Sequence, residues 1–340
     1  MTFKEMENMG VYFTTPAIGF TIPYLKRLRL SFFYARTAPG QEAFVNLDFL
    51  NDDTDFDLDI THMSLRDHLL HALEGVSIAM LEPDRRIPFD VEYPSKLQFS
   101  DRGVLGFGRP SGVVKHLAFD GHFGVNRSLE SGVDVRTANP VGRPRKKSIP
   151  DYVRSVGCAH KDRERATLPN RTGGWQFVCD ARTGSVLAGY EHIDNERCID
   201  KHLAIQGTKT MYKIKPASLT HDDNCTFEKW VKKNHPEDYK DVKDFVVDHF
   251  HKKNHVCQKK RWTRRQKRLL KGINTSCCEQ FHAFLRRFNF FLNSLRPSSH
   301  RFWVSAVAKF YNKKKDKIRG GPVPRRTVKN RMLKRPSRTR

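Results

Sequence analysis

The sequence of 340 residues has no long apolar run, few acidic residues and no framework of paired cysteines. No stretch of about 18 residues is continuously apolar, so we expect no transmembrane helix. Residues 1–8 lack the basic and then apolar order of a secretory signal peptide. The seven cysteines are odd in number and scattered, which is unlike a secreted disulfide scaffold and favours a reducing, intracellular compartment.

Acidic residues are outnumbered, because 37 Asp and Glu stand against 62 Lys and Arg, and the net charge is +25. Such an excess favours a polyanionic partner, since cationic side chains release the counterions condensed on nucleic acid. The simpler alternative is a basic protein that its charge keeps in solution. The positive charge is clustered, however, and clustering favours DNA as the partner and the nucleus as the location.

Two internal segments concentrate this charge. Lys252–Lys271 contains ten Lys or Arg, no acid, and Trp262, which predicts a surface that follows phosphates, with a solvated helix face as the alternative. Residues 142–147 read Gly-Arg-Pro-Arg-Lys-Lys and resemble the core of an AT-hook, which lays arginine in a narrow minor groove, with a plain linker as the alternative. The predicted DNA-binding residues are Arg143, Arg145, Lys259, Lys260, Arg261, Arg264, Arg265 and Arg268.

The pattern of apolar residues predicts an α/β protein with a mixed sheet, flanking helices and a helical C-terminal part. Trp175–Asp180 and Val186–His192 alternate apolar and polar residues on either side of Gly184, which predicts a β-hairpin. Further strands are expected near Val104–Phe119 and Tyr212–Asp222. Helices are expected at 61–80, 193–205, 227–234, 241–251, 262–271, 276–293 and 299–312.

Four regions follow from this pattern: an N-terminal remnant (1–60), a mixed helical and strand region (61–112), the main domain (113–312) and a basic tail (313–340). Within the main domain, residues 128–172 form a basic insertion rich in Pro and Gly. The tail holds 13 Lys or Arg against one acid, so we expect it to be disordered. It can serve as a nuclear-import signal or as a nucleic-acid arm, which the sequence does not separate.

Three acidic residues stand where strands end or a helix begins. Asp120 follows an apolar run, Asp222 closes an extended stretch, and Glu279 opens a helix. Each alone has an ordinary explanation, as a turn residue, a helix cap or a partner of the helix dipole. Together, stiffly held carboxylates suit two Mg²⁺ ions about 4 Å apart, which clamp the attacking and leaving oxygens of a phosphoryl transfer.

Four short motifs surround these acids in a fixed order. They are Phe119-Asp-Gly-His-Phe-Gly-Val-Asn-Arg127, Asp222-Asp-Asn-Cys225, Val247-Asp-His-Phe-His-Lys-Lys-Asn-His-Val-Cys257 and Asn274-Thr-Ser-Cys-Cys-Glu-Gln280. Together they resemble motifs of the Kyakuja-Dileera-Zisupton transposase family, over roughly residues 113–312. The resemblance implies an RNase H-like core in which Asp120, Asp222 and Glu279 hold two Mg²⁺ ions for DNA cleavage and strand transfer.

Departures from the family pattern keep other interpretations open. His122 stands where the family usually has Asn, and no clustered Cys-x-x-Cys precedes the first acid. The alternative is therefore a truncated or domesticated copy that binds DNA without cleaving it, and a third is a scaffold that binds no nucleic acid. Asp223 adjoins Asp222, and either could be the ligand, although the Asp-x-x-Cys spacing favours Asp222. The sequence leaves open whether the protein forms a homo-oligomer.

A separate zinc site is predicted from Cys225, His251, His255 and Cys257, with His249 in reserve. Histidine and cysteine are the ligand types of tetrahedral zinc sites. On a helix, His251 and His255 would be four residues apart and share a face. The alternative is a solvated basic helix with incidental histidines, since the spacing matches no standard zinc finger.

Overall fold

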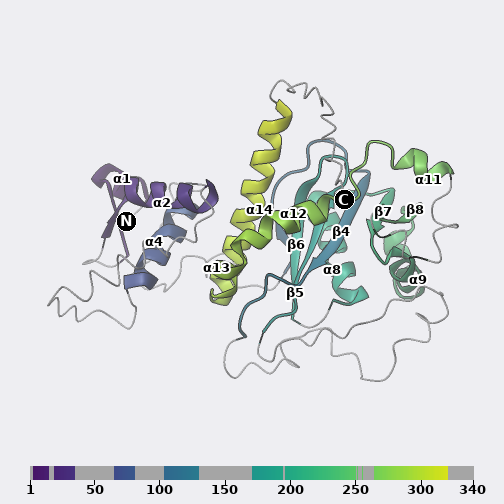
Figure 1. Cartoon of the computed structure of the whole chain (residues 1–340), viewed down its shortest axis with the longest axis horizontal. Helices are drawn as coiled ribbons and strands as arrows, with labels where there is room; N and C mark the ends of the chain where they lie inside the picture. The colour runs from purple at the N-terminus through teal and green to yellow at the C-terminus, as the bar shows by residue number, and fades with distance from the viewer. Residues whose placement is uncertain are drawn as a thin grey trace, which may run out of the picture.

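The protein is a mixed α/β structure in which a six-stranded sheet is flanked by helices (Figure 1). The computed structural model describes residues 3–14, 19–34, 65–80, 103–129, 171–193, 196–249, 251, 255 and 264–320. Among these residues, no helix combines the length and the apolar character needed to cross a bilayer. The helices are α1 (Phe3–Met9), α2 (Ile22–Tyr34), α4 (Leu65–Ala79), α8 (Cys198–Tyr212), α9 (Asn224–Asn234), η1 (Glu237–Tyr239), α11 (Arg264–Leu269), α12 (Cys277–Leu285), η3 (Arg286–Phe288), α13 (Asn289–Asn293) and α14 (Pro297–Gly320).

The main sheet has the strand order β3-β6-β5-β4-β7-β8. Its strands are β3 (Leu105–Gly106), β4 (His116–His122), β5 (Gly174–Asp180), β6 (Ser185–His192), β7 (Ser218–His221) and β8 (Asp244–Val247). Neighbours from β3 to β4 are antiparallel, whereas β4, β7 and β8 are parallel. The predicted hairpin is confirmed, because β5 and β6 pair around Gly184, whose positive φ of 66° suits glycine in a tight turn. Helix α8 connects β6 to β7, and α9 connects β7 to β8.

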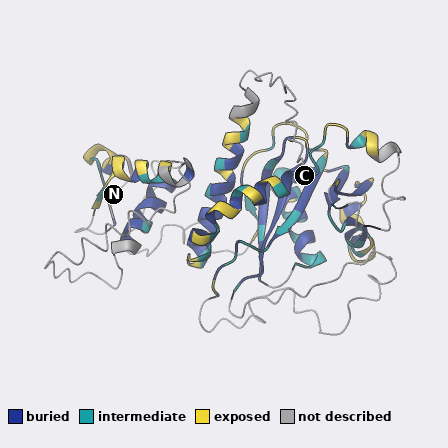
Figure 2. Cartoon of the chain, in the orientation of Figure 1, coloured by how far each residue is buried: buried dark blue, intermediate teal, exposed yellow. Residues whose placement is uncertain are grey.

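The two faces of the sheet carry separate apolar cores, because successive side chains on a strand point to opposite faces. On β5, Phe177 and Cys179 belong to the core shared with α12 and α14. Val178, between them, belongs to the core shared with α8 and α9. The buried strands at the centre of Figure 2 lie between these two layers of helices. Helix α12 therefore has a fixed position over one face of the sheet.

The segment predicted as a helix over 241–251 is instead the edge strand β8 and the loop after it, so this prediction is wrong. Asp244–Val247 is buried along its whole length and pairs in parallel with β7. A short run that is buried on both faces has no alternating pattern, which is why periodicity alone assigned it to a helix. The parallel pairing of β8 makes β7 an interior strand.

Several predicted boundaries are displaced. Helix α8 begins five residues after 193 and continues to Tyr212, so strand β7 starts only at Ser218. Helix α14 continues to Gly320, so residues 313–320 of the tail predicted to be disordered are helical. Lys315 explains part of this extension, because its Nζ lies 3.3 Å from Gln280 Oε1 and 5.1 Å from the Tyr311 ring centroid. Residues 321–340 lie outside the described residues.

The two ends of the predicted basic insertion leave the sheet side by side. Ser128 and Arg171 form an isolated antiparallel bridge. Arg171 Nε donates to Asn126 Oδ1 at 2.6 Å, and its Nη2 donates to the Asn293 carbonyl at 2.9 Å. The insertion between them, with Arg143 and Arg145, lies outside the described residues. The bridge thus closes the base of the insertion before β5 begins.

A buried ion-pair cluster joins the sheet to α14. Glu191 on β6 forms an ion pair with Arg127, whose Nε lies 2.8 Å from Glu191 Oε1 and whose Nη2 donates to Glu191 Oε2 at 3.3 Å. Arg301 Nη1 of α14 lies 3.6 Å from Glu191 Oε2. All three side chains are at most 2% exposed. Burial opposes the ionisation of Glu191, but Arg127, His300 and Arg301 outweigh burial and hold its pKa below the usual value. The charged form of Glu191 is therefore the one that the fold stabilises.

The N-terminal elements form a small unit of their own (Figure 1). Strands β1 (Val11–Phe13) and β2 (Gly19–Thr21) pair antiparallel, and α2 contacts α4. Phe33, near the end of α2, stacks on Phe310 of α14 with 4.6 Å between the ring centroids. This aromatic contact connects the N-terminal unit to the main domain.

Candidate carboxylate site

Two of the three predicted acids lie at matching positions on neighbouring parallel strands. In the register of β4 and β7, Ala118 pairs with Thr220. Two residues further on, Asp120 in β4 comes level with Asp222, the first residue after β7. Neighbouring strands are about 4.8 Å apart, and the carboxyl ends of parallel strands meet at one sheet edge. Asp120 thus lies within its strand and not after it, while Asp222 follows its strand as predicted.

The third acid comes from the helix that covers this face. Glu279 is the third residue of α12, so the prediction of a helix start is confirmed. Ligand atoms of Asp120, Glu279 and His282 all lie within 4.8 Å of one another. His282 Nδ1 is 3.6 Å from Asp120 Oδ2, and its ring stacks on His122 at 4.6 Å between centroids. Helix α12 therefore brings both a carboxylate and an imidazole to Asp120.

The sequence reasoning missed Glu196, a fourth carboxylate at this site. Glu196 stands just before α8, and its Oε1 lies 3.4 Å from Nε2 of His221, whose ring also faces Asp120 Oδ1 at 3.7 Å. A Cβ on Gly121 would lie 2.4 Å from Glu196 Oε2, so a side chain at that position would displace the carboxylate. Glycine within a strand often marks such a close approach. Gly121 was the one sequence feature that could have indicated a partner next to Asp120.

Negative charge dominates the site. Burial, followed by the charge of Asp222, raises the pKa of Asp120 well above its usual value. Glu196 and Glu279 raise it further, and only His221 acts against them. Burial alone would lower the pKa of His221, but the charges of Asp222 and Asp223 raise it well above the usual range. A cation among these carboxylates would relieve a repulsion that His221 relieves only in part.

The structure distinguishes Asp222 from Asp223. Asp223 Oδ1 accepts a hydrogen bond from the buried Lys201 Nζ at 2.9 Å. The Asp223 backbone N–H donates to Asp222 Oδ1 at 2.6 Å, and His221 Nδ1 lies 2.6 Å from the same oxygen. The side chain of Asp222 is 31% exposed and that of Asp223 is 19% exposed. Asp222 therefore offers the more open carboxylate, whereas Asp223 is engaged by an ammonium group.

The residues of the predicted zinc site come together only in part. Cys225 Sγ lies 3.5 Å from His255 Nδ1. His251 does not lie on a helix with His255, and its Nδ1 is 2.6 Å from Asp248 Oδ2. The bond to Asp248, supported by the charges of Asp222 and Glu279, raises the pKa of His251. Cys257 lies outside the described residues.

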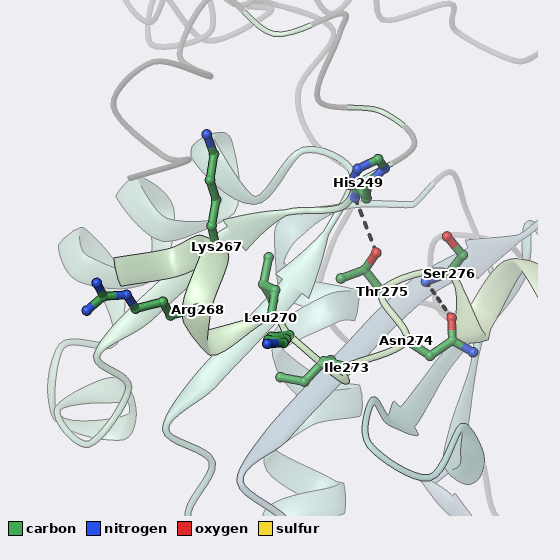
Figure 3. Close-up of a pocket in the computed structure, with 9 residues that line it drawn as sticks. His249, Lys267, Arg268, Leu270, Ile273, Asn274, Thr275 and Ser276 are labelled. Atoms are coloured by element: carbon green, nitrogen blue, oxygen red, sulfur yellow. Dashed lines mark hydrogen bonds between the residues drawn. The ribbon is translucent and has the colours of Figure 1, made fainter. Parts of the chain in front are cut away.

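A basic cavity of about 550 Å³ lies beside the segment that leads into α12 (Figure 3). Its lining includes Lys267, Arg268 and Lys271, and the polar run Asn274–Ser276 that leads into α12. His249 lies beside this run, because its backbone N–H donates to Thr275 Oγ1 at 3.3 Å. Of the predicted DNA-binding residues, Arg268 lines the cavity and Arg264 and Arg265 lie in α11, while Lys259, Lys260 and Arg261 fall outside the described residues. Cations therefore gather next to the end of α12 that carries Glu279.

Comparisons with protein-family models, with curated proteins and with solved structures found no match to this chain.

Proposed function

We propose that this protein cleaves and transfers DNA strands by metal-dependent phosphodiester chemistry, as a transposase-like enzyme with an RNase H-like core. The observation that carries the proposal is the approach of Glu279 on α12 to Asp120 on β4. Asp120 and Asp222 are level on parallel strands, and Glu279 reaches Asp120 from α12. These residues come from segments that are remote in the sequence, and the predicted pattern required them to meet.

The strand order supports an RNase H-like core. Such a core has three antiparallel strands followed by two parallel ones, with its first acid on the central strand. The strands β6, β5 and β4 supply the antiparallel part, and β7 and β8 supply the parallel part. Asp120 lies on β4, at the point where the two parts join. The family resemblance of the four motifs fits the same arrangement.

The donor set fits Mg²⁺. Magnesium prefers oxygen ligands and is usually held by a few carboxylates, and Asp120, Asp222 and Glu279 offer oxygens only. The pKa of Asp120 is raised first by burial and then by the charges of Asp222, Glu196 and Glu279, and a cation would relieve the repulsion among these carboxylates. Bound Mg²⁺ would supply charge stabilisation and activation of the attacking oxygen. The chain itself holds the three carboxylates rigidly, while His221 and Lys201 balance part of the charge from the α8 side.

The proposal is tested by nicking of supercoiled plasmid with Mg²⁺, with Mn²⁺ and with EDTA. We expect cleavage that requires a divalent cation and that falls at least about a hundredfold in Glu279→Gln, the scale set by losing one group that stabilises transition-state charge. Glu237→Gln is the matched control, because Glu237 is an exposed carboxylate in η1. Equal cleavage by Glu279→Gln and the parent would remove Glu279 from the proposed set.

DNA binding is expected to use the basic cavity beside α12. Replacing Lys267 and Arg268 by alanine should weaken DNA binding, and the loss of affinity should be equal for duplexes of different sequence. Side chains that contact phosphates do not distinguish one base pair from another. The slope of log affinity against log salt should fall by about 1 for each phosphate that the variant no longer neutralises. Fluorescence anisotropy at several salt concentrations measures both, with the exposed Lys233→Ala on α9 as control. An unchanged slope would place the DNA elsewhere.

One observation favours a second candidate, a protein that binds DNA without cleaving it. His221 and Lys201 already pair with Asp222 and Asp223, and His122 replaces the Asn that is usual in the family. Salt-sensitive binding without cleavage in either Mg²⁺ or Mn²⁺ would support this candidate over the first.

A further inference from the structure

Three cysteine thiols meet under the helix that carries Glu279. Cys179 belongs to β5, and Cys277 and Cys278 are the first two residues of α12. All three side chains are buried, with residue exposures of 0%, 0% and 3%. Their Sγ atoms lie within 4.8 Å of one another, and those of Cys179 and Cys278 are 3.5 Å apart. Residues separated by about a hundred positions therefore place their sulfur atoms at one point.

This spacing suits a shared metal ion better than a disulfide. Two sulfurs bound to tetrahedral zinc at about 2.3 Å each are about 3.8 Å apart. A disulfide requires about 2.05 Å, much less than the 3.5 Å between Cys179 and Cys278. Thiolate is also the ligand type that Zn²⁺ selects over harder cations. The distance between the sulfur atoms is thus closer to that of cysteines bound to one metal ion than to that of a disulfide.

The surroundings favour a negatively charged metal–thiolate group. Cys277 and Cys278 stand at the start of α12, the end of a helix at which the dipole favours negative charge. Lys315 of α14 approaches from the other side, because a Cβ placed on Gly184 would lie 2.7 Å from its Nζ and 3.6 Å from Cys277 Cβ. Three thiolates around Zn²⁺ carry one net negative charge, which the Lys315 ammonium can balance. The same ammonium contacts Gln280, the neighbour of Glu279.

We propose that Cys179, Cys277 and Cys278 bind one Zn²⁺ ion, which ties the start of α12 to β5, with the fourth ligand supplied by a small molecule such as water. This site is separate from the one predicted around Cys225 and His255, and it does not depend on DNA cleavage. It would fix the helix that presents Glu279 against the face of the sheet.

The test uses the full chain in a Cys225→Ala, Cys257→Ala background, so that both predicted thiolate ligands of the other site are removed. Titration with Co²⁺ in reducing, metal-free buffer should give one equivalent with thiolate-to-cobalt charge-transfer absorption. Adding Cys179→Ser should abolish that absorption and raise the dissociation constant for Zn²⁺ at least about tenfold, the lower end of the cost of disturbing a metal site. Cys198→Ser is the matched control, because Cys198 starts α8 outside the cluster and should leave both unchanged.

Circular dichroism and urea unfolding show whether each variant folds. If Cys179→Ser does not fold, Cys278→Ala provides the same test from the helix side. The proposal is overturned if the Cys225→Ala, Cys257→Ala protein gives no thiolate-to-cobalt absorption, or if the cluster variants bind as tightly as Cys198→Ser. An intact mass two hydrogens lower under reducing conditions would also overturn it, because it would show a disulfide in place of a metal site.

Discussion

Asp120→Asn is expected to lower metal-dependent DNA cleavage at least about a hundredfold while the protein remains folded. Asp120 is the residue that the other acids share, because its Oδ2 side faces Glu279 and His282 and its strand position is level with Asp222. Asparagine keeps the shape and removes one anionic ligand. The increase in the protein's unfolding temperature on addition of Mg²⁺ should therefore disappear together with cleavage.

In the metal-free protein, Asp120→Asn should not lower the stability and should increase it as the pH rises. The pKa of Asp120 is raised in the folded protein by burial and by Asp222. Its contribution to stability is full below the unfolded pKa of about 3.9 and is lost as the pH rises through the folded pKa. Asparagine carries no charge at any pH, so the variant should become more stable relative to the parent in EDTA as the pH rises through the folded pKa of Asp120.

Thermal unfolding in EDTA and in Mg²⁺ at two pH values, combined with plasmid nicking, separates these effects. The control is Asp241→Asn, which changes an exposed carboxylate in the loop before β8. A variant that loses cleavage because it is unfolded, or one that retains both cleavage and the Mg²⁺ effect, would contradict the proposed role of Asp120.

Glu191→Gln is expected to destabilise the protein by about 3–5 kcal/mol, the usual cost of removing one partner from a buried ion pair. The change removes the carboxylate charge that the guanidinium groups of Arg127 and Arg301 both approach, and both of these side chains are at most 2% exposed. Glutamine can still accept a hydrogen bond, so the lost charge and not a lost volume causes the effect.

The pH dependence of this stabilisation has a definite sign. The pKa of Glu191 is lowered in the folded protein, so its contribution is present above the unfolded value, near 4.5, and is lost as the pH falls through the folded pKa. Urea unfolding of parent and variant should therefore differ most at neutral pH and converge in acid. Glu237→Gln, which breaks an exposed pair with Lys240, should cost less than about 1 kcal/mol. A similar small cost for Glu191→Gln would show that water reaches the cluster.

The sequence predicted the β5–β6 hairpin, the mixed sheet, the position of Asp222 after its strand and the position of Glu279 at a helix start, because each has a local signature. Alternation marks the hairpin, and short polar motifs mark Asp222 and Glu279. Strand β8 was missed because four consecutive buried residues give no alternation. The length of α8 was missed because its boundary at Tyr212 depends on tertiary contacts, including the bond from the Tyr212 hydroxyl to the Leu187 carbonyl.

The composition of the site was harder to predict than its position. Glu196 and His282 reach Asp120 only because α8 and α12 pack on opposite faces of the same sheet. No spacing in the sequence encodes such a meeting. The same holds for the thiol of Cys179, which is brought to Cys277 and Cys278 by the packing of α12 on β5. Motifs therefore identified the acids, and packing determined their neighbours.

The bridge between Ser128 and Arg171 has a consequence for how this gene can change. The polypeptide departs from the sheet and returns to it at adjacent positions, held by Asn126 and by the Asn293 carbonyl. Lengthening a loop whose ends are already clamped costs only about 0.6 kcal/mol for each doubling of its length. Residues can thus be gained or lost there over generations with little effect on folding, and a foreign peptide or label grafted at that point would leave the carboxylates where they are.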